Sequence, residues 1–314
     1  MIAAAGTSIP ILVVLGPTAS GKSDLAEALA HALDGEIVGV DSMQVYRGLE
    51  AGTYKPSAAA RRRVPHHLVD IADPRHDFNL GDFVRAAEEA IAGILGRGRL
   101  PILAGGTGMY LRGLLKGIDP APRRDPALRL ALEALADRRG TPHLHRILQA
   151  NDPRTAARLA PADRMRLVRA LERALGSGRP AAAATWGRPD RLPAIKVGLL
   201  PEPGLLRARI DARVEAMFAA GIVAETEALL AAGVPAEGSA LKALGYREAV
   251  ALLRGEVDLA GAIAAAKRHT RQFARRQMAW FRREPDVRWF GVEGEEPGRL
   301  RSEVENYVRL RRNR

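Results

Sequence analysis

The sequence predicts an α/β fold, in which a parallel sheet is flanked by helices and interrupted by a basic, all-helical insertion. Three observations support this prediction. Up to residue 117, short apolar runs alternate with segments of helical composition. A glycine-rich octapeptide separates the first apolar run from the first helical segment. From residue 118 to 192 the strand signals vanish, and this block carries 15 Arg, no Lys and 8 acidic residues.

The first strand and helix enclose a phosphate-binding motif. The apolar run at 10–15 predicts a buried strand, and the Ala- and Leu-rich segment 23–33 predicts a helix. Between them, Gly16-Pro-Thr-Ala-Ser-Gly-Lys-Ser23 matches G-x-x-x-x-G-K-[ST], the P-loop. Backbone N–H groups and a helix N-terminus bind phosphate in such a loop. An ordinary glycine-rich turn is the alternative, but the flanking elements favour a P-loop NTPase-like core.

Polar residues follow two of the next three predicted strands. These strands are expected at 37–40, 67–71 and 100–104, with an amphipathic helix at 83–95. Ligands of parallel sheets bind beyond the carboxyl ends of the strands, so Lys22, Asp41 and Thr107 are expected to lie together. Asp41 is either a general base, an indirect Mg²⁺ ligand or a turn residue. The glycines around Thr107 either admit a ligand or form a plain turn.

The rest of the chain is predicted to complete this core. Helices of the insertion are broken at Gly140-Thr-Pro142 and at Asp152-Pro153. A strand is expected at 194–200, helices through 204–284 with breaks near 233–235 and 255, and a short basic helix in 297–314. The predicted domains are therefore residues 1–117 with 193–314, the catalytic core with C-terminal helices, and the helical insertion 118–192.

Composition restricts the classes of function. The chain of 314 residues has no Cys, which excludes disulfides, thiolate zinc sites, iron–sulfur clusters and Cys nucleophiles. No apolar stretch has the length of a membrane span, so we expect a cytoplasmic protein without a membrane partner. The net charge of +12 favours a polyanionic partner, although 42 of the 48 basic residues are Arg, as a GC-rich genome also encodes. Adjacent His66 and His67 are expected to be structural rather than metal ligands.

Beyond the P-loop, further sequence blocks occur in a fixed order, namely Asp41-Ser-Met-Gln-Val-Tyr46, Gly52-Thr-Tyr-Lys-Pro56, Val64-Pro-His-His-Leu-Val-Asp70, Pro101-Ile-Leu-Ala-Gly-Gly-Thr-Gly-Met-Tyr-Leu111, Arg166-Leu-Val-Arg-Ala-Leu-Glu172, Ala243-Leu-Gly-Tyr-Arg-Glu248, Thr270-Arg-Gln-Phe-Ala-Arg-Arg-Gln277 and Trp280-Phe-Arg282. With these blocks the chain resembles the bacterial tRNA dimethylallyltransferase (tRNA isopentenyltransferase) family. Two segments depart from the family pattern. Tyr54 replaces the Ala of Gly-Thr-Ala-Lys-Pro, and Pro161-Ala-Asp-Arg-Met-Arg166 stands where the family has Pro-Asn-Asp-x-Gln-Arg, so that Met165 replaces a Gln.

The resemblance implies a reaction. The family transfers a five-carbon prenyl group from dimethylallyl diphosphate to N6 of the adenine immediately 3′ of the anticodon, requires Mg²⁺ and releases diphosphate. It implies that Asp41 accepts the N6 proton, that Thr107 binds the oxygen of the breaking bond, and that Ser23 ligates Mg²⁺. The residues expected to hold the diphosphate are Gly16, Pro17, Thr18, Ala19, Ser20, Gly21, Lys22, Ser23, Arg209 and Arg213.

The resemblance also implies a tRNA-binding surface, for which the insertion is the main candidate. The residues expected to face the anticodon stem-loop are Asp41, Ser42, Met43, Gln44, Thr107, Arg129, Met165, Arg166, Leu167, Val168 and Arg169. Helical periodicity adds an arginine stripe opposite an apolar face. The stripe consists of Arg268, Arg271, Arg275 and Arg282, of which the first three are expected to contact tRNA, and the opposite face carries Phe273, Gln277, Trp280 and Phe281. The stripe either contacts phosphates or is an ordinary solvated face.

Two rival functions share the P-loop. A small-molecule kinase would consume a nucleoside triphosphate, and a non-enzymatic RNA-binding protein would bind tRNA without changing it. The basic insertion and the arginine-rich helix disfavour the kinase, and the basic insertion also disfavours prenylation of free adenine nucleotides. We expect a monomer.

Overall fold

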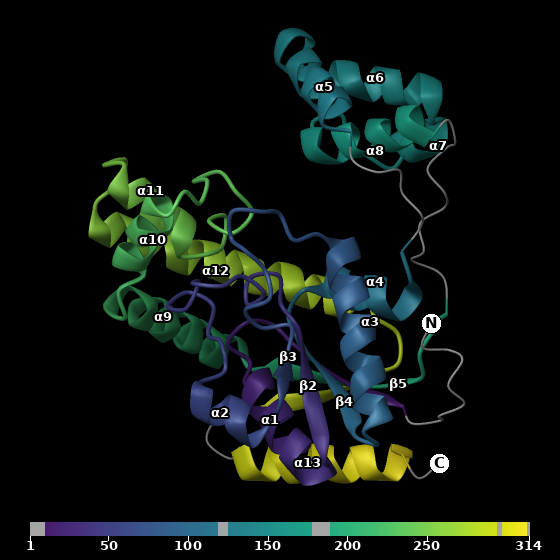
Figure 1. The fold of residues 1–314 in the computed structure, drawn as a ribbon, viewed down its shortest axis with the longest axis vertical. Helices are drawn as coiled ribbons and strands as arrows, with labels where there is room; N and C mark the ends of the chain where they lie inside the picture. The colour runs from purple at the N-terminus through teal and green to yellow at the C-terminus, as the bar shows by residue number, and fades with distance from the viewer. Residues whose placement is uncertain (1–9, 119–124, 178–188, 294–296, 313–314) are drawn as a thin grey trace. The chain divides into compact units, whose positions relative to one another are not determined.

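A six-stranded parallel sheet forms the centre of the larger of the two units of the chain, which confirms the predicted fold class (Figure 1). The computed structural model describes residues 10–118, 125–177, 189–293 and 297–312. The strand order is β3-β2-β4-β1-β5-β6. The strands are β1 (Ile11–Leu15), β2 (Gly35–Val40), β3 (His66–His67), β4 (Leu100–Gly105), β5 (Ala194–Pro201) and β6 (Val287–Val292).

Two strands differ from the sequence prediction. β3 has two residues instead of the predicted five, because Leu68 and Asp70 adopt φ angles of 64° and 59° and leave the extended conformation. β6 was not predicted, although it pairs with β5 along its whole length, from Val287 to Val292.

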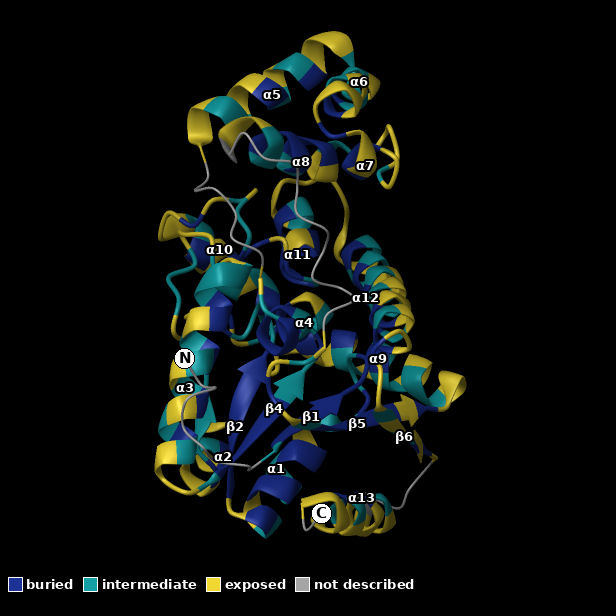
Figure 2. Cartoon of the chain, turned by 90° about the vertical axis from the view of Figure 1, so that its right-hand side faces the viewer, coloured by how far each residue is buried: buried dark blue, intermediate teal, exposed yellow. Residues whose placement is uncertain are grey.

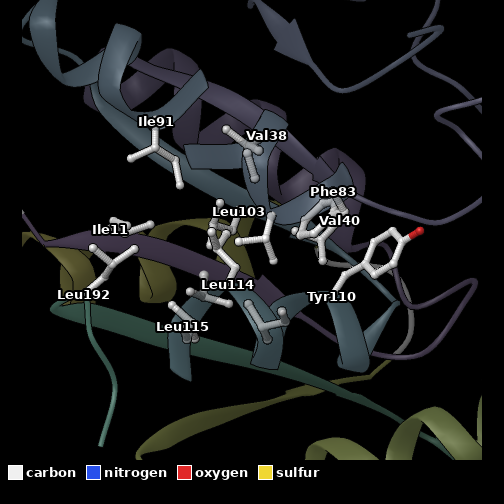
Figure 3. Packing of buried hydrophobic residues seen from close by; sticks show 14 of the residues in the cluster. Ile11, Val38, Val40, Phe83, Ile91, Leu103, Tyr110, Leu114, Leu115 and Leu192 are labelled. Atoms are coloured by element: carbon white, nitrogen blue, oxygen red, sulfur yellow. The ribbon is translucent and has the colours of Figure 1, made fainter. Parts of the chain in front are cut away.

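Helices cover both faces of the sheet, and the four central strands β2, β4, β1 and β5 are mostly buried, whereas β3 and β6 at its edges are partly exposed (Figure 2). One face packs against α3 (Leu80–Gly96) and α4 (Gly108–Lys116), through Val38, Val40 and Leu103 (Figure 3). The other face packs against α1 (Lys22–Leu33) and α13 (Pro297–Arg312). The remaining helices of this unit are α2 (Ala58–Arg63), α9 (Pro203–Ala219), α10 (Ile222–Ala231), α11 (Tyr246–Leu253) and α12 (Leu259–Phe281).

Strand register brings the polar loops together at one edge of the sheet. Gly105 at the end of β4 is level with Leu15 of β1 and with Val40 of β2. A Cβ at Gly105 would lie 2.1 Å from the carbonyl oxygen of Val40, so only glycine permits this close approach. The P-loop, Asp41 and the loop after β4 therefore begin side by side.

The chain divides into two compact units, residues 1–115 with 190–314 and residues 116–189. The second unit consists of α5 (Pro126–Arg139), α6 (Thr141–Asn151), α7 (Pro153–Ala156) and α8 (Arg164–Ser177). Gly140, with φ of 83°, separates α5 from α6, and Asp152 caps α7, so the helices break where the sequence predicted. None of the helices in the described ranges is long and apolar enough to cross a membrane.

Candidate active site

The P-loop forms the turn between β1 and α1. Ala19 and Gly21 have φ angles of 62° and 85°, in the left-handed region, and these conformations curve the backbone of the loop. Lys22 Nζ folds back and donates to the carbonyl oxygen of Pro17 at 3.2 Å. No side chain caps the N-terminus of α1, so its backbone N–H groups are available to an anion.

Asp41 and Thr107 are fixed at the ends of neighbouring strands. Asp41 Oδ1 accepts hydrogen bonds from the backbone N–H groups of Met43 at 2.8 Å and Gln44 at 3.4 Å. Thr107 Oγ1 accepts from the N–H of Ser42 at 3.1 Å, and Thr107 N donates to the carbonyl oxygen of Val40 at 3.1 Å. One carboxylate oxygen of Asp41 therefore stabilises a turn. The role of Asp41 in proton transfer stays a prediction.

Arg213 reaches the P-loop from α9. Its Nη1 donates to Thr18 Oγ1 at 3.3 Å, and its guanidinium lies 4.0 Å from the ring centroid of Tyr54. Tyr54 is held in a left-handed conformation with φ of 57°. The side-chain amide of Gln44 donates to the carbonyl oxygens of Thr53 and Tyr54, both at 3.1 Å. The Gln44 amide therefore organises this loop, and its predicted contact with tRNA stays a prediction.

A cavity of about 1280 Å³ opens over the P-loop. Ala19 to Ser23 form its floor, and Tyr54, Arg209 and Arg213 form part of its wall. The cavity continues to the end of β6 and the first turns of α13. It therefore joins Ala19 to Ser23 of the predicted diphosphate-binding loop with Arg209 and Arg213 of α9. Of the other predicted site residues, Gly16, Pro17, Thr18, Asp41 and Thr107 are not part of its lining.

The electrostatics of this cavity favour an anion. The pKa of Lys22 is lowered to about 8, chiefly by burial and next by the positive charge of Arg213, while the charge of Asp41 opposes both effects. Burial also lowers the pKa of Arg213, while the Asp41 charge raises it. Two cations held close together out of water gain from a polyphosphate that neutralises both.

The donor set of the site fits a divalent cation shared with a phosphate. Ser23 is exposed and lines the cavity next to Lys22. Within the described ranges, no group of three or more His, Asp or Glu residues is placed to hold a metal by itself. Mg²⁺ characteristically binds through one or two protein oxygens, waters and substrate phosphates, which matches a lone hydroxyl beside an anion site.

The predicted tRNA-facing residues of the insertion divide into exposed and buried ones. Met165 is 76% exposed, and Arg166 is exposed beside Asp163, its partner at 3.3 Å. Arg129 and Arg169 both bind Glu172, at 3.3 and 3.1 Å. The prediction for Leu167 and Val168 is wrong for their side chains, which are 0% and 1% exposed in the core of the insertion.

The arginine stripe on α12 is narrower than predicted. Arg268 and Arg275 are exposed, while Gln277 and Phe281 are buried on the opposite side, as predicted. Arg271 instead binds the carboxylate of Asp211 on α9, with Nε at 2.8 Å from Oδ1. The pairing offsets its charge, so the contact of Arg271 with phosphate is expected to be the weakest of the three.

One residue at the site was missed by the sequence analysis. Gln277 was assigned only to the apolar face of its helix, but its amide binds the P-loop and the loop after β4. The signal was available, because an amide on an otherwise apolar helix face needs buried polar partners.

Comparisons with known proteins agree on one family. A family model described as IPP transferase matches residues 44–284. The tRNA dimethylallyltransferase of Anaeromyxobacter dehalogenans is 52% identical over 89% of this chain and 92% of its own length. The crystal structure of the tRNA isopentenylpyrophosphate transferase from Bacillus halodurans is 35% identical with a TM-score of 0.75, over 98% of this chain and 97% of that one.

A third likeness concerns the fold alone. A eukaryotic dimethylallyltransferase acting on tRNA is 23% identical with a TM-score of 0.80, over 96% of this chain and 80% of that one. These matches support a prenyltransferase and neither the kinase nor the non-enzymatic alternative. This chain belongs to the tRNA dimethylallyltransferase family of IPP transferases.

Proposed function

We propose that this enzyme transfers the dimethylallyl group of dimethylallyl diphosphate to N6 of the adenine immediately 3′ of the anticodon and releases diphosphate. The observation that carries the proposal is the cationic P-loop cavity at the edge of the sheet. Asp41 is close enough to this cavity for its charge to raise the pKa of both Lys22 and Arg213.

The diphosphate is the leaving group, and the P-loop cavity stabilises it. The bond between C1 of the prenyl group and the diphosphate oxygen breaks, and its electron pair stays on that oxygen. Lys22, with a pKa of about 8, is mostly protonated at neutral pH and neutralises the charge that develops. Arg213 contributes a second cation, held in place by Thr18 and Tyr54.

Thr107 and Asp41 act on the two ends of the transfer. Thr107 Oγ1 already accepts from Ser42 N, and its only interaction as a donor among the described residues, to Ser42 Oγ, is long at 3.5 Å. Its hydroxyl proton can therefore turn to the oxygen of the breaking bond. The new bond forms between N6 and C1, and the Asp41 carboxylate accepts the proton that N6 loses.

Ser23 is the residue that would hold Mg²⁺ through its hydroxyl, and the ion, when bound, would supply further positive charge beside the diphosphate. The requirement for Mg²⁺ rather than another divalent cation is part of the proposal.

The insertion is proposed to bind the tRNA anticodon stem-loop. Its net charge of +7 over residues 118–192 suits a phosphate backbone. An adenine in a single-stranded loop can leave its stack at low cost and enter a pocket. We further propose that the enzyme acts as a cytoplasmic monomer.

The test is transfer to a defined base. The protein is incubated with dimethylallyl diphosphate, Mg²⁺ and unmodified tRNA, and nuclease fragments are analysed by mass spectrometry. The expected result is one five-carbon unit on the anticodon-loop fragment. A matched tRNA with guanine in place of the adenine should remain unmodified. The original tRNA should also remain unmodified when the metal is chelated. Prenylation at another base, or ATP-dependent phosphorylation without prenyl transfer, would overturn the proposal.

A further inference from the structure

Gln277 joins two loops of the active site that are far apart in the sequence. Its Oε1 accepts a hydrogen bond from Thr18 N in the P-loop at 2.8 Å. Its Nε2 donates to the carbonyl oxygen of Gly106, in the loop after β4, at 2.9 Å. The side chain is 6% exposed, on the buried face of α12. One amide thus bridges the loop that carries Lys22 and the loop that carries Thr107.

The packing around this bridge leaves no space for a Cβ at two neighbouring glycines. A Cβ at Gly106 would lie 2.2 Å from Gln277 Nε2, and a Cβ at Gly108 would lie 2.3 Å from the indole of Trp280. Both glycines flank Thr107, so α12 presses on the backbone at either side of that residue. Thr107 N is also fixed by the carbonyl oxygen of Val40. The position of the Thr107 hydroxyl is therefore set by α12 together with β2.

The helix that carries Gln277 is itself held at several points. Arg271 binds Asp211 of α9, and His269 Nδ1 lies 2.8 Å from Glu248 Oε1 on α11. Phe281, at the end of α12, is 1% exposed in the main core. These contacts make α12 a rigid support for the amide.

The direction of the first hydrogen bond restricts how the P-loop binds phosphate. Because Thr18 N donates to Gln277, this N–H is not available to an anion in the cavity. The hydroxyl oxygen of Thr18 is also engaged, because it accepts a hydrogen bond from Arg213 Nη1. Ser20 N also donates within the loop, to the carbonyl oxygen of Pro17 at 3.3 Å, so the backbone donors for phosphate are then the other N–H groups that follow Thr18, up to the start of α1.

We propose that Gln277 is a positioning residue for the transfer reaction. Its amide holds the P-loop and the Thr107 loop at a fixed separation, so that Lys22 and Thr107 act on the same leaving group. This inference rests on the proposed function. A residue that served stability alone would lower the melting temperature without a specific link to Thr107.

Two variants separate these roles. Gln277→Met removes both hydrogen bonds at similar volume, whereas Gln277→Glu keeps an oxygen that can accept from Thr18 N and loses the donor to Gly106. The matched control is Gln272→Met, which changes the same residue type on the exposed face of α12. We expect Gln277→Met to lower kcat about 10- to 100-fold, with the tRNA Kd within about twofold of the wild type.

The decisive measurement is a double-mutant cycle in kcat with Thr107→Ala. If Gln277 acts through the placement of Thr107, Gln277→Met should lower kcat clearly less in the Thr107→Ala background than in the wild type. Hydrogen exchange gives a readout that does not depend on activity: the Thr18 N–H should lose protection in Gln277→Met, while the core strands stay protected.

The outcomes are distinct. The proposal would be overturned if Gln277→Met lowers kcat by the same factor in the wild type and in the Thr107→Ala background. It would also be overturned if the kcat of Gln277→Met lies within twofold of the wild type. If Gln277→Met does not fold, Gln277→Glu carries the same cycle, with protection of Thr18 N retained and kcat reduced. Absence of prenyl transfer by the wild type would refute the proposed function instead, and the exchange measurement would still test the bridge.

Discussion

The edge of the sheet and the insertion place their polar residues in opposite ways. At the edge, hydrogen bonds join segments far apart in the chain: Thr18 to Gln277 spans 259 residues, and Arg213 to Thr18 spans 195. In the insertion, Arg166 and Arg169 find partners three residues away on or next to their own helix. Distant segments therefore build the first region, whereas the second combines local pairs with pairs between its own helices, such as Arg129 with Glu172, 43 residues apart.

This difference indicates a division of labour. Partly buried groups with long-range partners are held in one geometry, which a reaction needs. Exposed ion pairs such as Arg166–Asp163 contribute about 0–1 kcal/mol each, so they can rearrange when a polyanion binds. We therefore expect substitutions at the edge to change the rate of transfer, and substitutions on exposed arginines to change the affinity for tRNA.

The largest effect should come from removing the insertion. Replacing residues 118–189 by a short Gly/Ser linker should eliminate measurable tRNA binding and leave pyrophosphate binding, because the P-loop, Arg209 and Arg213 all lie in the other unit. Both affinities can be measured by calorimetry, after a cooperative thermal transition has shown that the variant folds. Equal loss of the two would mean that the segment is needed to form the cavity, and the division would fail.

Asp41→Asn should have the next largest effect. Asparagine keeps an oxygen that accepts from Met43 N, so the turn is preserved, but it cannot take a proton from N6. We expect single-turnover transfer to fall about 10²- to 10⁴-fold, with a tRNA Kd changed far less. Normal turnover in this variant would leave Asp41 with the turn role alone.

The pH dependence of pyrophosphate binding should report on Lys22. Its pKa of about 8 predicts affinity that is constant at lower pH and falls up to about tenfold per pH unit above, as the ammonium loses its proton. Arg213→Gln removes a charge that lowers this pKa, so the decline should move to higher pH. Asp41→Asn removes a charge that raises it, so the decline should move to lower pH.

Calorimetric titrations without metal, across about pH 6 to 10, measure these shifts. The ionisation of pyrophosphate itself affects all three proteins equally, so the comparison between them is internally controlled. The same midpoint in all three would show that Lys22 is not coupled to Arg213 and Asp41.

The smallest effects are expected on the exposed side of α12. Arg268→Gln and Arg275→Gln should each weaken tRNA binding about equally across tRNA sequences, and flatten the slope of log K against log[salt] by about 0.7–0.9. Arg271→Gln should change the slope less, since Asp211 already neutralises this residue. An unchanged slope in the Arg268/Arg275 double variant would show that this face is only solvated.

Sequence patterns predicted most of the core and one half of the site. Strand–loop–helix order placed the P-loop, and the shared strand ends placed Asp41 near Thr107, as the register of β2 with β4 confirms. Patterns could not foresee that Leu68 would turn left-handed and end β3, because that depends on the loop it joins. The sequence motif predicted that Leu167 and Val168 face tRNA. Both side chains are buried instead, because an amphipathic helix packs its apolar face against the core.

The remaining misses depend on contacts between distant segments. The segment from Val287 to Val292 contains an arginine and a tryptophan between its apolar residues and follows a helical segment. Only its pairing with β5 makes it a strand. Gln277 bridges loops that lie 171 and 259 residues away, which no local pattern contains.

The central claim is that the P-loop cavity acts on the leaving diphosphate and not on tRNA, and Lys22→Ala tests it most directly. Single-turnover prenyl transfer is measured with the enzyme saturated by tRNA, alongside the tRNA Kd of the same preparation, with Lys242→Ala as an exposed lysine control. We predict a rate lowered about 10³-fold or more, with the tRNA Kd within about threefold of the wild type. A normal rate, or a rate and a tRNA affinity lost together in a folded protein, would contradict the account.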